Sequence, residues 1–266
     1  LFAPRSTAVA GASSSAQKIG GIPIDYQRRF GFDGALYAVN PKATQVQGLQ
    51  AWPTLQAIGQ PVDLAICAVP AALVDDTLDD AIAAGVKGVV LFSSGFAEVG
   101  PEGSAAQARL AQRARAAGVR LIGPNCLGLM NLRRNVYATF SPAPGVGRVA
   151  AGRIGLVSQS GAFGAYAYSM ARERGVGLSL WVTTGNEADV QLADCLAWLA
   201  QDPDTDVIMA YMEGCRDGQR LREALALAQA CGKPVVMVKV GSTALGAQAA
   251  ASHTAALAGD DAVYDA

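Results

Sequence analysis

Residues 62–92, VDLAICAVPAALVDDTLDDAIAAGVKGVVLF, decide the fold class. Two apolar runs, 62–69 and 86–92, enclose residues 71–84, which have the length and composition of a helix. Apart from Asp63 and Lys87 near their starts, both runs are apolar, without the alternation of a strand that faces water on one side. Such strands are buried on both faces and are typical of a parallel sheet with crossover helices.

The same alternation continues on both sides of this stretch, so we predict an α/β fold with two tandem open parallel sheets. Residues 1–130 form the first unit, an irregular Pro- and Gly-containing segment at 131–152 connects the two, and residues 153–266 form the second unit. The other expected strands are 7–10, 35–39, 119–122, 154–157, 178–182, 207–212 and 235–240. The other expected helices are 17–30, 54–58, 102–117, 162–174, 189–201 and 218–231.

Composition narrows the class of protein. The chain has 266 residues and a net charge of −1, so nothing favours a nucleic-acid or membrane-surface partner. Apolar runs stay below the roughly 18 residues of a spanning helix, and residues 1–5 lack signal-peptide character. The five cysteines show no metal-ligand spacing, so we expect free thiols, no metal site and a cytoplasmic location. Residues 260–266 resemble the opening of a helix, so we expect the chain to be part of something longer.

Two turns of the first unit have phosphate-binding character. Residues 11–15, GASSS, lie between a strand and a helix, where backbone N–H groups and a helix N-terminus attract phosphate. The spacing is not that of a dinucleotide fingerprint, and the second strand ends in Asn40-Pro41-Lys42 instead of an acid. Lys42 suits an additional phosphate, such as the one on the ribose of coenzyme A. The alternative is an ordinary tight turn with a solvated lysine.

Residues 123–128, GPNCLG, follow the fifth strand. Asn125 can bond to backbone or ligand. We interpret Cys126 as a packed thiol, because the chain has no second histidine to activate it.

The second unit contributes three candidate groups. Residues 158–162, SQSGA, place Ser158, Ser160 and Gly161 at a helix start, where an oxyanion binds or Ser160 simply caps the helix. Glu213 ends a strand and His253, the single histidine, lies in the loop AQAAASHTAALAGDD at 247–261. A carboxylate can hold one nitrogen of an imidazole and leave the other to carry a covalent group. The alternatives are a solvated glutamate and a surface histidine without chemistry.

Together these stretches resemble the NDP-forming acyl-CoA synthetases, relatives of the succinyl-CoA ligase α subunit. The resemblance rests on GPNCLG, SQSGA, TTGNEADV and SHTAALAG, in order along nearly the whole chain. It implies a Rossmann-like domain that binds coenzyme A and a flavodoxin-like domain with a phosphorylated histidine. It also implies conversion of an acid, coenzyme A and ATP to acyl-CoA, ADP and phosphate through an acyl phosphate.

By the resemblance, His253 is the phosphorylated histidine, Glu213 orients it, and Ser158, Ser160 and Gly161 hold the phosphate. The implied coenzyme A contacts are Gly11, Ser13, Ser14, Ser15, Lys42, Ser93, Ser94 and Gly95. ATP or ADP and Mg²⁺ would bind to an ATP-grasp domain or subunit absent from this chain, in a homo- or hetero-oligomer. The resemblance does not specify which small acid is the substrate, or whether ADP or GDP is the nucleotide.

Two other functions compete with the ligase. Similar modules fused to acetyltransferases sense acyl-CoA and catalyse no ligation. His253 and Glu213 argue against this alternative, since a sensor needs no phosphoryl carrier. A nicotinamide-dependent oxidoreductase is disfavoured by the missing acid after the second strand.

Overall fold

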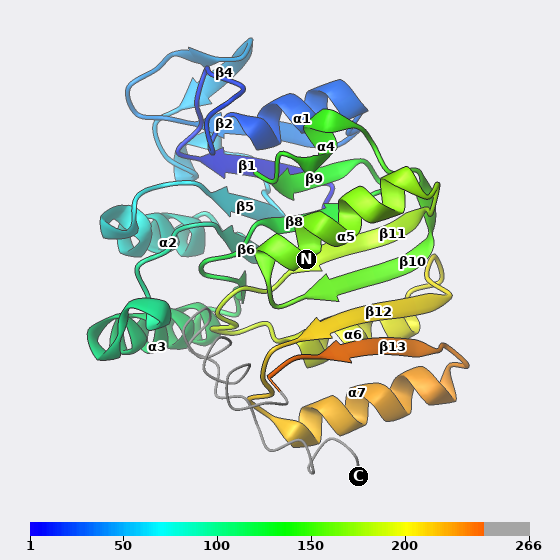
Figure 1. The fold of residues 1–266 in the computed structure, drawn as a ribbon. Coiled ribbons are helices and arrows are strands. Elements are labelled where there is room, and N and C mark those ends of the chain that lie inside the picture. Colours follow the sequence, from blue (N-terminus) through cyan, green and yellow to red (C-terminus); the bar gives the residue numbers. More distant parts are fainter. Residues whose placement is uncertain (242–266) are drawn as a thin grey trace.

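The computed structural model describes residues 1–241. Within that range the chain forms two sheets with helices packed on them (Figure 1). This confirms the predicted α/β class with two tandem sheets. Residues 242–266, which include His253, lie outside the described part.

The first sheet has the strand order β3-β4-β2-β1-β5-β6-β7, and all neighbours are parallel except β3 and β4. From β1 the chain goes to β2 on one side and returns to β5 on the other. The carboxyl ends of β1 and β5 therefore form a topological switch point, where open α/β sheets bind ligands. The strands are β1 Ser6–Ala10, β2 Ala35–Val39, β3 Gln45–Val46, β4 Leu49–Trp52, β5 Leu64–Cys67, β6 Gly88–Leu91 and β7 Arg120–Ile122.

Helices cover this sheet because its central strands are apolar on both faces. Every residue of β1, β5 and β6 is buried. The helices are α1 Ile22–Phe30, α2 Val74–Ala83 and α3 Pro101–Ala116, and the short 3₁₀ turns are η1 Gln56–Ile58, η2 Ala71–Leu73 and η3 Ala97–Val99.

Helix α1 begins at Ile22, not at residue 17 as predicted. The reason is a close backbone approach. A Cβ atom on Gly20 would lie 2.0 Å from the carbonyl oxygen of Gly11, and one on Gly21 would lie 1.9 Å from that of Ser15. The loop after β1 thus folds back on itself before the helix starts, and Pro23 in the first turn favours that start.

The second sheet has the order β13-β12-β10-β11-β8-β9. Strands β10 to β13 are parallel, and β8 and β9 form an antiparallel hairpin on β11. Helix α5 lies on one face, and α6 lies on the other (Figure 1). The strands are β8 Gly128–Asn131, β9 Val136–Thr139, β10 Ala151–Ser158, β11 Leu178–Thr183, β12 Val207–Met212 and β13 Val235–Lys239. The helices are α4 Ala143–Val146, α5 Gly161–Glu173, α6 Leu192–Gln201 and α7 Gly218–Ala230.

The segment 131–152, predicted to be irregular, contains strand β9 and the short helix α4. Strand β9 packs on the first unit, where the ring centroid of Tyr137 lies 4.7 Å from that of Phe30 and 6.2 Å from that of Tyr26. These aromatic contacts add to a hydrophobic core that contains residues of both sheets.

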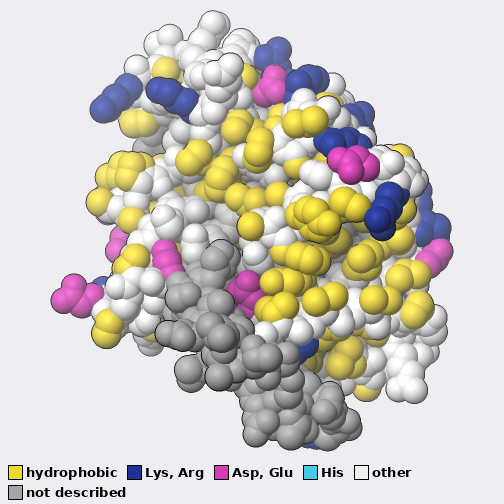
Figure 2. Space-filling model, in the orientation of Figure 1, with side chains coloured by type: hydrophobic (Ala, Val, Ile, Leu, Met, Phe, Trp, Pro, Cys, Tyr) yellow, Lys and Arg dark blue, Asp and Glu magenta, His cyan; other side chains and the backbone are white. Residues whose placement is uncertain are grey.

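The face of the second sheet beside α5 is partly apolar at the surface (Figure 2). Met209 and Val236 are paired across β12 and β13, and both are exposed, as is Val238. Among the described helices, none is long and apolar enough to cross a membrane.

Candidate functional site

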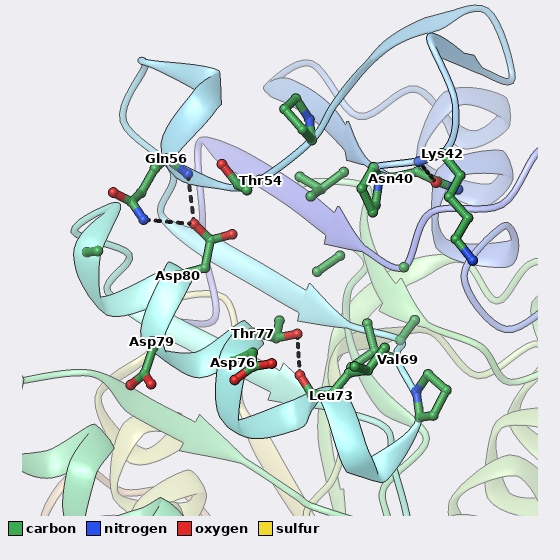
Figure 3. A pocket seen from close by; sticks show the side chains of 18 residues that line it. Asn40, Lys42, Thr54, Gln56, Val69, Leu73, Asp76, Thr77, Asp79 and Asp80 are labelled. Atoms are coloured by element: carbon green, nitrogen blue, oxygen red, sulfur yellow. Dashed lines mark hydrogen bonds between the residues drawn. The ribbon is translucent and has the colours of Figure 1, made fainter.

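A groove lies at the carboxyl ends of the strands of the first sheet (Figure 3). It has a volume of about 780 Å³ and occupies the switch point between β1 and β5. Gly11 and Lys42, both predicted from the sequence, line it together with Val69 and Pro70. The groove has the size of a site for a nucleotide-like ligand.

Gly11 lets the loop after β1 lie against the end of β5. Its φ is +83°, and a Cβ atom there would be 2.5 Å from the carbonyl oxygen of Ala68. The side-chain amide of Asn40 donates to the carbonyl of Ala12 at 2.8 Å and accepts the backbone N–H of Lys42 at 2.8 Å. These bonds bring the predicted Gly11 and Lys42 turns together.

The predicted serines lie in the same loop. Ser13 is partly buried, Ser14 and Ser15 are exposed, and the Ser13 hydroxyl accepts the N–H of Ser15. The N–H of Ser13 donates to the carbonyl of Gly20 at 3.2 Å, which places the loop beside the start of α1. Such a start is positive and attracts phosphate.

Carboxylates from α2 form the wall across from Lys42 (Figure 3). Asp80 accepts the backbone N–H groups of Leu55 at 2.6 Å and Gln56 at 3.2 Å, and Asp79 is paired with Arg113. Among the described residues that line the groove, Lys42 is the only cation. A phosphate would therefore be held at the Lys42 side.

The other predicted contacts of the first unit follow β6 and β7. The hydroxyl of Ser93 donates to the carbonyl of Val69, and the N–H of Asn125 donates to the carbonyl of Ser93 at 2.9 Å. Ser94 and Gly95 are exposed, and Gly95 has a φ of +101°. The predicted residues thus follow neighbouring strands along one edge of the sheet.

Cys126 is a packed thiol, in agreement with its interpretation. It is buried, and its sulfur lies 3.4 Å from the carbonyl oxygen of Leu91. Burial raises the pKa of this thiol to about 12, so a thiolate nucleophile is disfavoured. The five cysteines are all free.

The predicted phosphate turn of the second unit connects β10 to α5. Ser160 is the N-cap of α5, and its hydroxyl accepts the N–H of Phe163 at 3.3 Å. The hydroxyl of Ser158 donates to the carbonyl of Ser160 at 2.7 Å, inside the turn. A Cβ atom on Gly161 would be 2.9 Å from the side chain of Leu127, so the turn lies close to the GPNCLG segment.

Glu213 lies next to this turn. Its side chain is buried at the end of β12. The side-chain oxygen of Gln159 accepts the N–H of Glu213 at 2.6 Å and that of Gly214 at 3.0 Å, and its nitrogen donates to the carbonyl of Gly214 at 2.7 Å. Gln159 therefore joins Glu213 to the phosphate turn, as proximity of strand ends predicts.

Glu187 is a buried carboxyl that was not a functional candidate from the sequence. It is buried, has a φ of +54°, and accepts the hydroxyl of Thr184 at 2.9 Å and the N–H of Leu192 at 2.8 Å. Burial raises its pKa to about 7, although these hydrogen bonds act to lower it. The carboxyl thus titrates near neutral pH, beside a cavity of about 460 Å³ that it shares with α3 and Arg216. In the sequence, only the position of Glu187 in the motif TTGNEADV could have indicated a functional role.

His253 cannot be placed against these groups, because it lies outside the described residues. Within residues 1–241, no three His, Cys, Asp or Glu side chains are grouped to hold a metal ion.

Comparison with known proteins gives two family matches. Residues 5–131 match the family described as "CoA binding domain". Residues 151–266 match the family described as "Succinyl-CoA ligase like flavodoxin domain".

Several curated proteins are similar over nearly the whole chain. An ADP-forming acetate–CoA ligase I of Archaeoglobus fulgidus is 42% identical over 99% of this chain and 38% of its own length. The α subunit of ADP-forming acetate–CoA ligase I of Pyrococcus furiosus is 38% identical over 100% of this chain and 57% of its own length. The chain therefore spans about two to three fifths of these relatives.

A solved structure has the same fold. It is the acetyl-coenzyme A synthetase 1 of Candidatus Korarchaeum cryptofilum in complex with phosphate and ADP. It matches with a TM-score of 0.91 and 37% identity, over 99% of this chain and 56% of that one.

Proposed function

The chain belongs to the family of ADP-forming acyl-CoA synthetases, and on this premise we propose that it is the part of such a ligase that binds coenzyme A and carries the phosphohistidine. We assign coenzyme A to residues 1–130 and phosphoryl transfer to residues 153–266, joined by 131–152. The family matches at 5–131 and 151–266 support this division.

The single observation that carries the proposal is the grouping around Gln159. It places a buried carboxylate, Glu213, beside a helix start capped by Ser160. A helix start stabilises a phosphoryl group, and a carboxylate stabilises and orients an imidazole. Phosphoryl transfer needs this positioning and charge stabilisation more than further covalent chemistry.

The proposed reaction has three transfers. A nitrogen of His253 takes the γ-phosphoryl group of ATP, and ADP leaves. A carboxylate oxygen of the acid then takes the phosphoryl group from His253 and becomes an acyl phosphate. The sulfur of coenzyme A attacks the acyl carbon, phosphate leaves, and the thiol proton is released.

Each remaining predicted residue has a place in this scheme. Lys42 contacts the ribose phosphate of coenzyme A, and Gly11, Ser13, Ser14 and Ser15 hold its diphosphate. The end of the proposed coenzyme A site away from Lys42 is formed by Ser93, Ser94, Gly95 and Asn125. Ser158, Ser160 and Gly161 receive the transferred phosphate.

ATP and Mg²⁺ would bind to an ATP-grasp domain or subunit outside this chain, and the enzyme would act on a small carboxylic acid in the cytoplasm. The name of the Pyrococcus furiosus relative as an α subunit supports a partner of this kind.

A thioester assay tests the proposal. The complete enzyme, with its nucleotide-binding part, is given ATP, Mg²⁺, coenzyme A and one acid at a time from acetate to aryl acids. We expect acyl-CoA and ADP in equal amounts, and neither with His253→Ala. Coenzyme A binding without thioester formation by any acid would contradict the ligase and favour an acyl-CoA sensor.

A further inference from the structure

A buried carboxamide connects the two units near the candidate site. Asn186 follows β11, and its side chain is fully enclosed. Its nitrogen donates to a carboxylate oxygen of Glu98 and to the side-chain oxygen of Gln107 at 3.0 Å. Its oxygen accepts the side-chain N–H of Asn125 at 3.3 Å. All three partners belong to the first unit.

Glu98 is also bonded to the backbone at the end of the loop 93–95. Its second carboxylate oxygen accepts the backbone N–H groups of Gly95 and Phe96. Burial alone would raise the pKa of Glu98, but the amide of Asn186 and these N–H groups hold it below its ordinary value. Glu98 is therefore a charged acceptor that fixes Gly95, at the exposed end of the predicted coenzyme A path.

The segment that carries Asn186 is also bonded to the phosphate turn and to the GPNCLG segment. The N–H of Thr184 donates to the carbonyl of Ser158 at 2.9 Å, and the N–H of Asn186 donates to the carbonyl of Pro124 at 2.9 Å. Residues 184–187 thus contact the turn at Ser158, the GPNCLG segment and, through Glu98, the loop at 93–95.

We propose that Asn186 and Glu98 are positioning residues that hold the loop 93–95 in place for the thiol end of coenzyme A, in register with the phosphate turn. The inference rests on the proposed function. If Lys42 holds the ribose phosphate at one end of the groove, the thiol end extends along the strand ends toward residues 93–95 and the second unit.

The physical reason is loop order. Gly95 has a left-handed φ and an exposed position, so an unfixed loop would sample many conformations. A site that is competent for only part of the time binds its ligand more weakly by that fraction. The chemistry itself is unaffected once the ligand is bound.

The test uses the complete enzyme with Asn186→Asp and Glu98→Gln, alone and combined. The first substitution places two carboxylates against each other, so we expect the KM for coenzyme A to rise about tenfold. The kcat and the coenzyme A-independent phosphoryl labelling by ATP should stay within about twofold. Glu102→Gln, an exposed carboxylate on α3, is the control and should leave all three values unchanged.

The double variant restores the bond between positions 98 and 186, since the new amide at position 98 can donate to the new carboxylate at position 186, while the side-chain oxygen of Gln107 still lacks the donor that Asn186 gave it. We expect it to recover the KM to within about threefold of the wild type. The inference is overturned if Asn186→Asp leaves this KM unchanged, or if kcat, labelling and KM all worsen together without recovery in the double variant. A wild type that neither labels nor uses coenzyme A would instead contradict the proposed function.

Discussion

The side-chain oxygen of Gln159 lies 2.6 Å from the backbone nitrogen of Glu213. This bond joins the turn after β10 to the turn after β12, two strands that are neighbours in the sheet. Gln159 lies between Ser158 and Ser160, so the residue that supports Glu213 is part of the phosphate turn itself. The two groups proposed to serve one phosphoryl transfer are thus fixed to each other through a single side chain.

Gln159→Met should therefore destabilise the fold and disturb the site together. It leaves the N–H groups of Glu213 and Gly214 and the carbonyl of Gly214 without this partner. We expect the free energy of unfolding to fall by about 2–4 kcal/mol, measured by urea denaturation. Gln229→Met, at an exposed position of α7, should change it by less than about 0.5 kcal/mol. Equal effects of the two substitutions would contradict this role.

Gly11→Ala tests the close approach at the switch point. The new methyl group would lie 2.5 Å from the carbonyl oxygen of Ala68, at a φ of +83°. Gly59 is a matched control, because its φ is +64° and nothing lies within 4 Å. We expect Gly59→Ala to cost about 1 kcal/mol of unfolding free energy and Gly11→Ala clearly more, with loss of coenzyme A binding. Similar unfolding costs would show that the loop adjusts freely.

Lys42 can be tested by changing the ligand as well as the protein. If Lys42 contacts the ribose 3′-phosphate, Lys42→Ala should weaken binding of coenzyme A about tenfold but hardly change that of 3′-dephospho-coenzyme A. Lys87→Ala is the control, since Lys87 is exposed just before β6, at the opposite end of the strands. Titration calorimetry gives the affinities. Equal weakening for both ligands would remove the ribose phosphate as the partner of Lys42.

Glu187 predicts a pH dependence of stability. Its pKa is raised from 4.5 to about 7. Between these pH values the carboxyl is protonated in the folded protein and ionised in the unfolded chain. The contribution of this group to stability therefore grows as the pH falls through 7 toward 4.5. At pH 8, Glu187→Gln should raise the unfolding free energy by about 2–3 kcal/mol relative to the wild type, and at pH 5 by much less. Urea denaturation at both pH values measures this, and an equal difference at both would refute the raised pKa.

The sequence predicted the fully buried strands β1, β5 and β6, because their burial on both faces is visible as apolar runs. Strands β12 and β2, which are only partly buried, begin and end at the predicted residues. Both hairpins were missed. Strand β3 has two residues, and β9 follows polar residues at 133–135 whose turn depends on the positive φ of Asn135. A local pattern this short does not separate a strand from a connection.

The individual turns of the site were predicted from the sequence, but the contacts between them were not. Gly11 and Lys42 follow strands of the first sheet, whereas Ser158 ends β10 and Glu213 follows β12 in the second sheet. Within each sheet, the carboxyl ends of parallel strands lie at the same edge. The partners Glu98, Gln107 and Asn186 were not predicted, since their bonds join positions 79 to 88 residues apart. The raised pKa of Glu187 likewise depends on burial by distant segments.

The most direct test of the central claim is phosphorylation of His253. The complete enzyme is incubated with ATP labelled at the γ-phosphate and Mg²⁺, and the protein is then assayed for an acid-labile, base-stable phosphate. We predict a label in the wild type, its loss on addition of acid and coenzyme A, and none in His253→Ala. A label that persists in His253→Ala, or no label in a wild type that binds coenzyme A, would contradict the phosphohistidine account.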